Sequence, residues 1–187
     1  LKAMLVDALL LDGAFEEASS LVSGLPAGAD YRSNPFELAV PECFSCAAES
    51  LGWTPQRIVN HGLELQKASK GRGDPAARAL VSLAAYRLRR RVYDPDRHAR
   101  FDAAETLKLV ERAVAEAKDP EVKAAAAFVG ARAALLDGTS WQGGLERGRA
   151  VDWYRRLVAL EKTAYEAEVV KECGYYRDWK AARVKAD

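Results

Sequence analysis

The stretch Asp74-Pro75-Ala76-Ala77-Arg78-Ala79 recurs in layout 45 residues later, as Asp119-Pro120-Glu121-Val122-Lys123-Ala124. In each copy an Asp-Pro pair opens a run with helical spacing of apolar residues, and proline suits the first position of a helix. An offset of this length fits a unit of two helices. Such a unit cannot bury its apolar face alone, so neighbouring units must stack. The sequence therefore predicts an all-α array of antiparallel helix pairs, an α-solenoid.

Apolar residues keep helical spacing through most of the chain. The predicted helices cover residues 1–11, 15–22, 54–70, 74–92, 101–118, 119–136, 145–160 and 163–182. Gly13 separates the first two, which makes them a helical hairpin. No segment shows sustained alternation with a period of two, so we expect no β-sheet.

Residues 24–46 interrupt the helical pattern. Five helix-breaking residues stand there: Gly24, Pro26, Gly28, Pro35 and Pro41. We expect residues 25–53 to form one long ordered loop, and such loops often carry function. Before it, residues 1–24 are predicted to be the end of a preceding repeat in a longer protein. After it, residues 54–187 are predicted to form a helical-repeat array with an aromatic C-terminal cap.

The composition excludes some classes of function. Of 187 residues, 28 are basic and 27 are acidic, so the formal charge of +1 gives no global attraction to nucleic acid or to anionic lipid. No stretch is long and apolar enough to span a bilayer. Neither the glycine pairs nor the two histidines stand in a catalytic or phosphate-binding motif, so we expect no enzyme.

Cys43 and Cys46 form a closely spaced pair within the predicted loop. A redox pair would need the thioredoxin-like βαβ context, which is absent. A zinc site would need two further ligands, and the chain offers only His61, His98 and Cys173. The leading interpretation is a pair of structural thiols or a structural disulfide, with zinc and redox chemistry as alternatives. We expect no cofactor otherwise.

The strongest local cluster of positive charge surrounds Arg87, Arg90 and Arg91, within residues 87–100. Tyrosines interleave it, which is typical of contacts with RNA. Arg87 and Arg91 share one helix face, and Arg90 lies about 60° from it by helical geometry. Acidic residues follow closely in the sequence and can pair with these arginines. The near-neutral charge of the whole chain argues against nucleic acid as the partner.

Aromatic residues are concentrated in the C-terminal third of the chain. Trp141 and Trp153 are the two tryptophans that we single out as candidates for partner contact. A packed terminal cap, which repeat arrays require, is the leading interpretation of this region. The alternative is an aromatic groove that holds a peptide or a sugar.

Several motifs follow one another in a characteristic order: Asn34-Pro35-Phe36, the pair Cys43 and Cys46, the aromatic-rich residues 86–93, the alanine-rich residues 124–134, and a closing segment with Glu172-Cys173 beside aromatic residues. This order resembles the C-terminal region of a group of uncharacterised bacterial tetratricopeptide-like helical-repeat proteins. The resemblance implies a tetratricopeptide-like array and a structural or interaction role. It also favours the cell envelope or periplasm over the cytoplasm.

The sequence thus predicts a non-catalytic scaffold or protein-interaction module whose partner is a protein or peptide. One alternative is a protein that binds a metal or small ligand through the Cys43 and Cys46 loop. A third is RNA binding through the cluster at residues 87–100.

Overall fold

The computed structural model describes residues 1–25, 35–36, 53–92, 103–136 and 146–184, and this part of the chain is all helical, without a β-strand. Its helices are α1 (Lys2–Asp12), α2 (Phe15–Val22), α3 (Pro55–Ser69), α4 (Gly73–Val92), α5 (Ala103–Glu116), α6 (Pro120–Leu136), α7 (Glu146–Val158), α8 (Ala164–Glu172) and α9 (Gly174–Val184). The all-α prediction is confirmed. The predicted long loop at 25–53 lies almost wholly outside the described residues.

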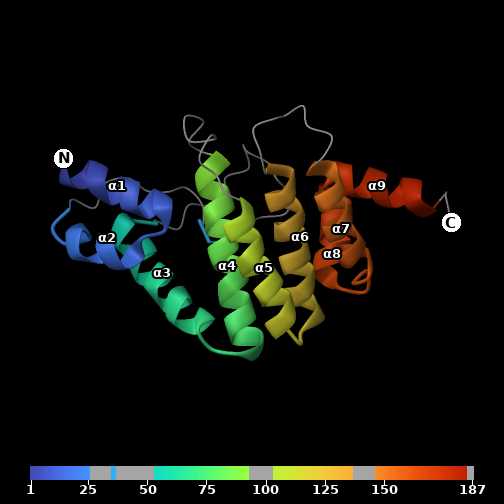
Figure 1. Ribbon diagram of the computed structural model, residues 1–187, viewed down its shortest axis with the longest axis horizontal. Coiled ribbons are helices and arrows are strands. Elements are labelled where there is room, and N and C mark those ends of the chain that lie inside the picture. The colour runs from blue at the N-terminus through green and yellow to red at the C-terminus, as the bar shows by residue number, and fades with distance from the viewer. Residues whose placement is uncertain (26–34, 37–52, 93–102, 137–145, 185–187) are drawn as a thin grey trace.

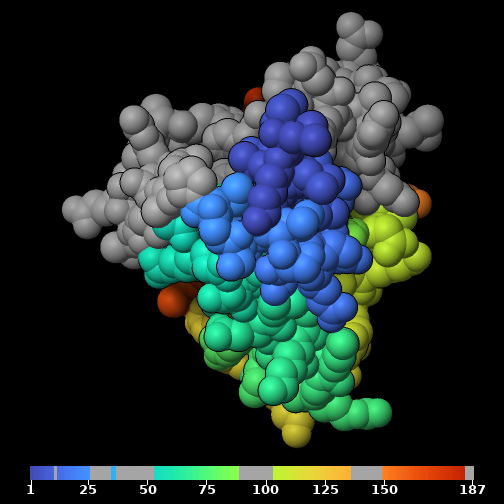
Figure 2. Space-filling view, turned by 90° about the vertical axis from the view of Figure 1, so that its left-hand side faces the viewer, coloured from blue at the N-terminus to red at the C-terminus, as the bar shows by residue number. Residues whose placement is uncertain are grey.

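Helices that follow one another in sequence also pack against one another in space. From α1 to α7 each helix contacts the next, α8 contacts α9, and α4, α6 and α8 contact one another in series. In Figure 1 helices α4 to α7 stand side by side, with α1 and α2 at one end and α9 at the other. Figure 2 looks onto the first of these ends, where α1 and α2 lie over α3.

Two hydrophobic clusters fill the interior, and α4 contributes to both. The first, here the N-terminal core, joins α1, α2, α3 and α4 with Phe36 and Trp53. The second, here the C-terminal core, joins α4 to helices α5 to α9. Residues Ala77, Leu80 and Ala84 of α4 face the C-terminal core, whereas Tyr86 faces the N-terminal core. Both sets are 1% exposed or less, so α4 is buried on two faces.

The expectation of one continuous helix over residues 163–182 is wrong. The chain leaves helical geometry at Cys173, where φ is −99° and ψ is 98°, so α8 and α9 are separate helices. A buried polar network then fixes α9 on α8. Glu166, 2% exposed, accepts hydrogen bonds from Tyr176 Oη at 2.7 Å and Lys180 Nζ at 2.9 Å. Burial raises the pKa of Tyr176, and its bond to the Glu166 carboxylate raises it further.

A glycine allows α6 and α7 to approach closely. A Cβ atom added to Gly130 of α6 would lie 2.5 Å from the indole ring of Trp153 on α7. Alanines occupy most of the remaining buried positions of α6, which also permits close helix packing. Trp153 therefore lies flat against a backbone surface and is only 5% exposed.

Carboxylates in the first turn of one helix cap the start of a later helix. Asp74 Oδ1 accepts the backbone N–H groups of residues 118 and 119, at 2.6 and 2.9 Å, just before α6. The carboxylate of Glu121, in the first turn of α6, accepts those of residues 164 and 165 at 2.8 and 2.9 Å, at the start of α8. These four hydrogen bonds satisfy N–H groups at or just before the start of a helix, which have no partner within the helix. The two contacts come from different positions of the repeated stretch: Asp119, the counterpart of Asp74, instead accepts the N–H of Glu121 at the start of its own helix, α6.

Replacing Gly130 by alanine should overpack the contact between α6 and α7. We expect Gly130→Ala to lower the free energy of unfolding by about 1–3 kcal/mol, measured by urea denaturation followed by circular dichroism. Gly174→Ala is the matched control, because a Cβ there would meet Arg177 Nη2 at an ordinary 3.6 Å. The control should be neutral or more stable by up to about 1 kcal/mol. Equal free energies of unfolding for the two variants would contradict the close contact between Gly130 and the Trp153 ring.

Asp74 should contribute an acid-dependent part of the stability. The N–H groups of Asp119 and Lys118 hold the pKa of Asp74 below its ordinary value of 3.8. A lowered native pKa means that the contribution is complete above pH 3.8 and is lost as the pH falls through the native pKa.

We therefore expect Asp74→Asn to be less stable than wild type at pH 7, with the difference shrinking progressively below pH 3.8. Urea midpoints measured from pH 7 to pH 2.5 test this. Asp178→Asn is the control, because that carboxylate is 80% exposed. A difference between Asp74→Asn and wild type that stays constant over this pH range would disprove the role of the charge.

Candidate functional site

Phe36, from the Asn-Pro-Phe motif, is buried in an aromatic cluster built from several helices. Its ring centroid lies 4.6 Å from that of Tyr86 on α4, 4.9 Å from that of His61 on α3, 5.7 Å from that of Trp53 and 5.9 Å from that of Phe15 on α2. Aromatic pairs at such separations contribute beyond their buried area. Phe36 therefore joins the N-terminal helices to α4.

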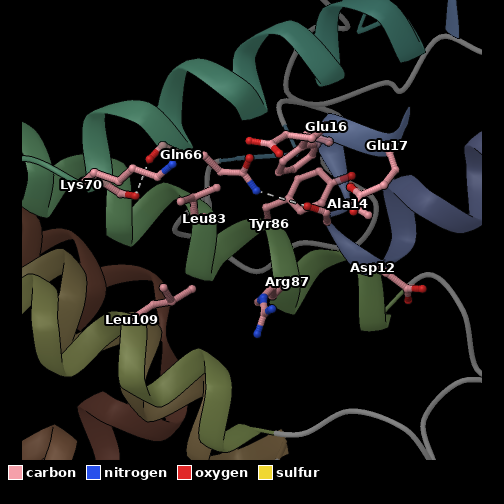
Figure 3. A pocket seen from close by; sticks show the side chains of 13 residues that line it. Asp12, Ala14, Glu16, Glu17, Gln66, Lys70, Leu83, Tyr86, Arg87 and Leu109 are labelled. Atoms are coloured by element: carbon pink, nitrogen blue, oxygen red, sulfur yellow. Dashed lines mark hydrogen bonds between the residues drawn. The ribbon is translucent and has the colours of Figure 1, made fainter. Parts of the chain in front are cut away.

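A groove of about 500 Å³ lies beside this cluster and is the candidate functional site. Figure 3 shows its lining side chains, which come from the turn between α1 and α2, from α2, from the end of α3, from α4 and from α5. The lining residues are Asp12, Gly13, Ala14, Phe15, Glu16, Glu17, Gln66, Ser69, Lys70, Leu83, Tyr86, Arg87 and Leu109. We call this feature the α2–α5 groove.

Two hydrogen bonds hold the end of α1 and the α1–α2 turn in place beside the α2–α5 groove. Tyr86 Oη donates to the carbonyl oxygen of Leu10 over 2.6 Å, in a buried contact with the last turn of α1. Gln66 Nε2 donates to the carbonyl oxygen of Gly13 over 3.4 Å. Because α4 holds the end of α1 and α3 holds the α1–α2 turn, the groove exists before any ligand binds. Preorganised sites lose less entropy on binding.

Charged side chains line the α2–α5 groove on opposite sides. Asp12, Glu16 and Glu17 come from the end of α1 and the first turn of α2, whereas Lys70 and Arg87 come from the end of α3 and from α4. None of these five makes an ion pair or a side-chain hydrogen bond with another residue of the described chain.

Charges elsewhere on the described surface are commonly paired. Arg156 Nη1 of α7 lies 2.8 Å from Glu111 Oε2 of α5, and Lys108 Nζ lies 2.6 Å from Glu105 Oε1 within α5. Arg78 of α4 pairs with Asp119. The α2–α5 groove therefore differs from these surfaces in leaving charges of both signs available.

A second hollow of about 520 Å³ lies along α3. Its lining residues are Trp53, Thr54, Gln56, Arg57, Asn60, His61 and Glu64. Its polar groups contact one another: Gln56 Nε2 donates to Asn60 Oδ1 over 2.9 Å, and His61 Nδ1 lies 3.7 Å from Glu64 Oε2. Because its polar groups already have partners, this hollow offers fewer free groups to a ligand than the α2–α5 groove.

Of the residues singled out from the sequence, Cys43, Cys46, His98 and Trp141 lie outside the described residues. Arg90 and Arg91 belong to α4, but their side chains are not among those described. In the part of the chain that the structure does describe, no three His, Cys, Asp or Glu side chains are grouped to hold a metal ion. No helix there is long and apolar enough to cross a membrane.

The structure separates the three remaining candidates. Arg87 lines the α2–α5 groove, and His61 lies between the aromatic cluster and the second hollow. Trp153 is packed in the C-terminal core with the Arg156 guanidinium 4.2 Å from its ring centroid, so its ring is not presented to a partner.

The other charged residues of the groove carry no signal in the sequence. Glu16, Glu17 and Lys70 are ordinary exposed residues at helix ends, where such charges are common. Only the packing of the α1–α2 turn against α3 and α4 brings them to one place. None of the family models, curated proteins or solved structures compared with this chain matches it.

Removing the Phe36 ring should weaken the whole N-terminal core. We expect Phe36→Ala to lower the free energy of unfolding by about 3–5 kcal/mol, as measured by chemical denaturation, because the ring is only 3% exposed and contacts four others. Tyr175→Ala is the aromatic control, since Tyr175 is 81% exposed. Its effect should stay within about 0.5 kcal/mol. Similar losses in both variants would contradict the anchoring role of Phe36.

Proposed function

We propose that this protein is a non-catalytic interaction module, a tetratricopeptide-like α-solenoid that binds a peptide segment of a partner protein in the α2–α5 groove. The observation that carries the proposal is the groove itself: a hollow of about 500 Å³, braced by Tyr86 and lined by side chains of both charge signs.

Two observations support a solenoid of the tetratricopeptide type. Neighbouring helices pack in sequence order, and α4, α6 and α8 follow one another in space. The carboxylate caps from Asp74 and Glu121 repeat with nearly the same sequence offset, between 43 and 45 residues. Arrays built in this way present extended surfaces that suit elongated ligands.

The chemistry of the lining favours a peptide over RNA. Arg87 is part of the basic cluster considered for RNA, but the same groove presents Asp12, Glu16 and Glu17, which repel phosphate. Leu83 and Leu109 add half-buried apolar surface between the charges, which suits the aliphatic side chains of a peptide.

Selection from a random peptide library displayed on phage tests the proposal. We expect enriched peptides to bind the wild-type protein and to bind Gln66→Trp at least tenfold more weakly, because the indole would fill the α2–α5 groove. Gln56→Trp is a matched control: it is the same substitution on the same helix, in the second hollow. It should bind like wild type, and circular dichroism should show both variants folded.

Failure to enrich any peptide, or equal binding to all three proteins, would refute the groove as the binding site. Loss of binding in Gln56→Trp alone would move the site to the second hollow and would equally refute the proposal.

A further inference from the structure

The charges of the α2–α5 groove are separated by element. In Figure 3 Asp12 and Glu17 lie at one end, Lys70 lies at the other, and Leu83 and Arg87 lie between the two ends. Every acidic group comes from the end of α1 or the start of α2, whereas Lys70 follows the end of α3 and Arg87 belongs to α4. The groove therefore has an acidic end and a partly apolar middle. Its basic groups lie at the opposite end, at Lys70, and along the middle, at Arg87.

Helix dipoles account for only some of these charges. Glu16 and Glu17 stand in the first turn of α2, and Lys70 follows the last turn of α3, so each favours its own helix. Asp12 is the last residue of α1, where a negative charge opposes the dipole. Arg87 lies within α4, half-buried, and has no acidic partner in the described chain. Within the described part of the chain, neither helix dipoles nor ion pairs account for Asp12 and Arg87.

We propose that the groove recognises a mixed-charge peptide segment, with basic side chains at one end, aliphatic side chains in the middle and acidic side chains at the other end. The inference rests on the proposed function, because it names the chemistry of the segment bound at that same site. Basic side chains meet Asp12, Glu16 and Glu17, and acidic side chains meet Lys70 at the far end and Arg87 on the way to it. A uniformly acidic or basic ligand faces like charge at one end, which costs binding free energy.

Synthetic peptides test this directly. The probes are fluorescein-labelled decapeptides with two lysines at one end, a Leu-Ala core and two glutamates at the other, made in both chain directions. Matched peptides replace all four charged residues by lysine, or all four by glutamate. We expect fluorescence anisotropy to show that one mixed peptide binds at least tenfold more tightly than either uniform peptide. Raising NaCl from 50 to 500 mM should weaken this binding, because the contacts are at the surface.

A charge reversal with a matching peptide separates recognition from structural damage. Arg87→Asp should bind the mixed peptide about tenfold more weakly than wild type and should bind the all-lysine peptide more tightly than wild type does. A variant that had merely lost its structure would not gain affinity for any peptide. Glu64→Lys, in the second hollow, is the control and should leave all affinities unchanged.

Equal affinity for mixed and uniform peptides, or no effect of Arg87→Asp, would overturn this inference. If phage-selected peptides still required Gln66 in that case, the proposed function would stand without it. If no peptide of any kind bound the groove, both would fall together.

Discussion

Helix α4 has to bury two faces at once, and the rest of the structure depends on this constraint. Ala77 and Ala84 face the C-terminal core, and Tyr86 points to the opposite side, into the N-terminal core. Small residues on the first face let α5 and α6 approach closely. On the second face a tyrosine reaches both Phe36 and the end of α1. Without α4 both clusters would be exposed on one side, because α4 residues are buried in each of them.

The general architecture could be predicted from the sequence because its determinants are local. The Asp-Pro pairs at residues 74 and 119 each stand at the start of a helix, α4 and α6, and Asp74 Oδ1 accepts the backbone N–H of Asp119. The break in the helix at Cys173 could not be predicted, because its determinant is not local. The chain there keeps helical spacing, and the carboxylate that holds α9 in place belongs to Glu166 on the previous helix. Such a contact between two helices leaves no periodic signal.

The candidate site was much harder to foresee. Arg87 could be predicted as a site residue because it belongs to a run of arginines. The other charged residues of the groove belong to no such run or motif. Glu17 and Lys70 lie 53 positions apart and meet at one groove only after three elements have packed. Spacing rules describe single helices, so they cannot show a surface composed of the ends of several. In contrast, Trp153 was a candidate for partner contact because it is a large aromatic residue, but its side chain is buried in the core.

The position of the α2–α5 groove has a consequence for cooperativity. Phe15 and Tyr86 belong to the N-terminal core, whereas Leu109 packs against the C-terminal core, so the groove spans the boundary between the two cores. Different regions of one protein open with different free energies. A ligand held by both sides binds only the closed form, and its binding free energy adds to the cost of separating them. A ligand of the kind proposed would therefore stabilise the contact between the two cores.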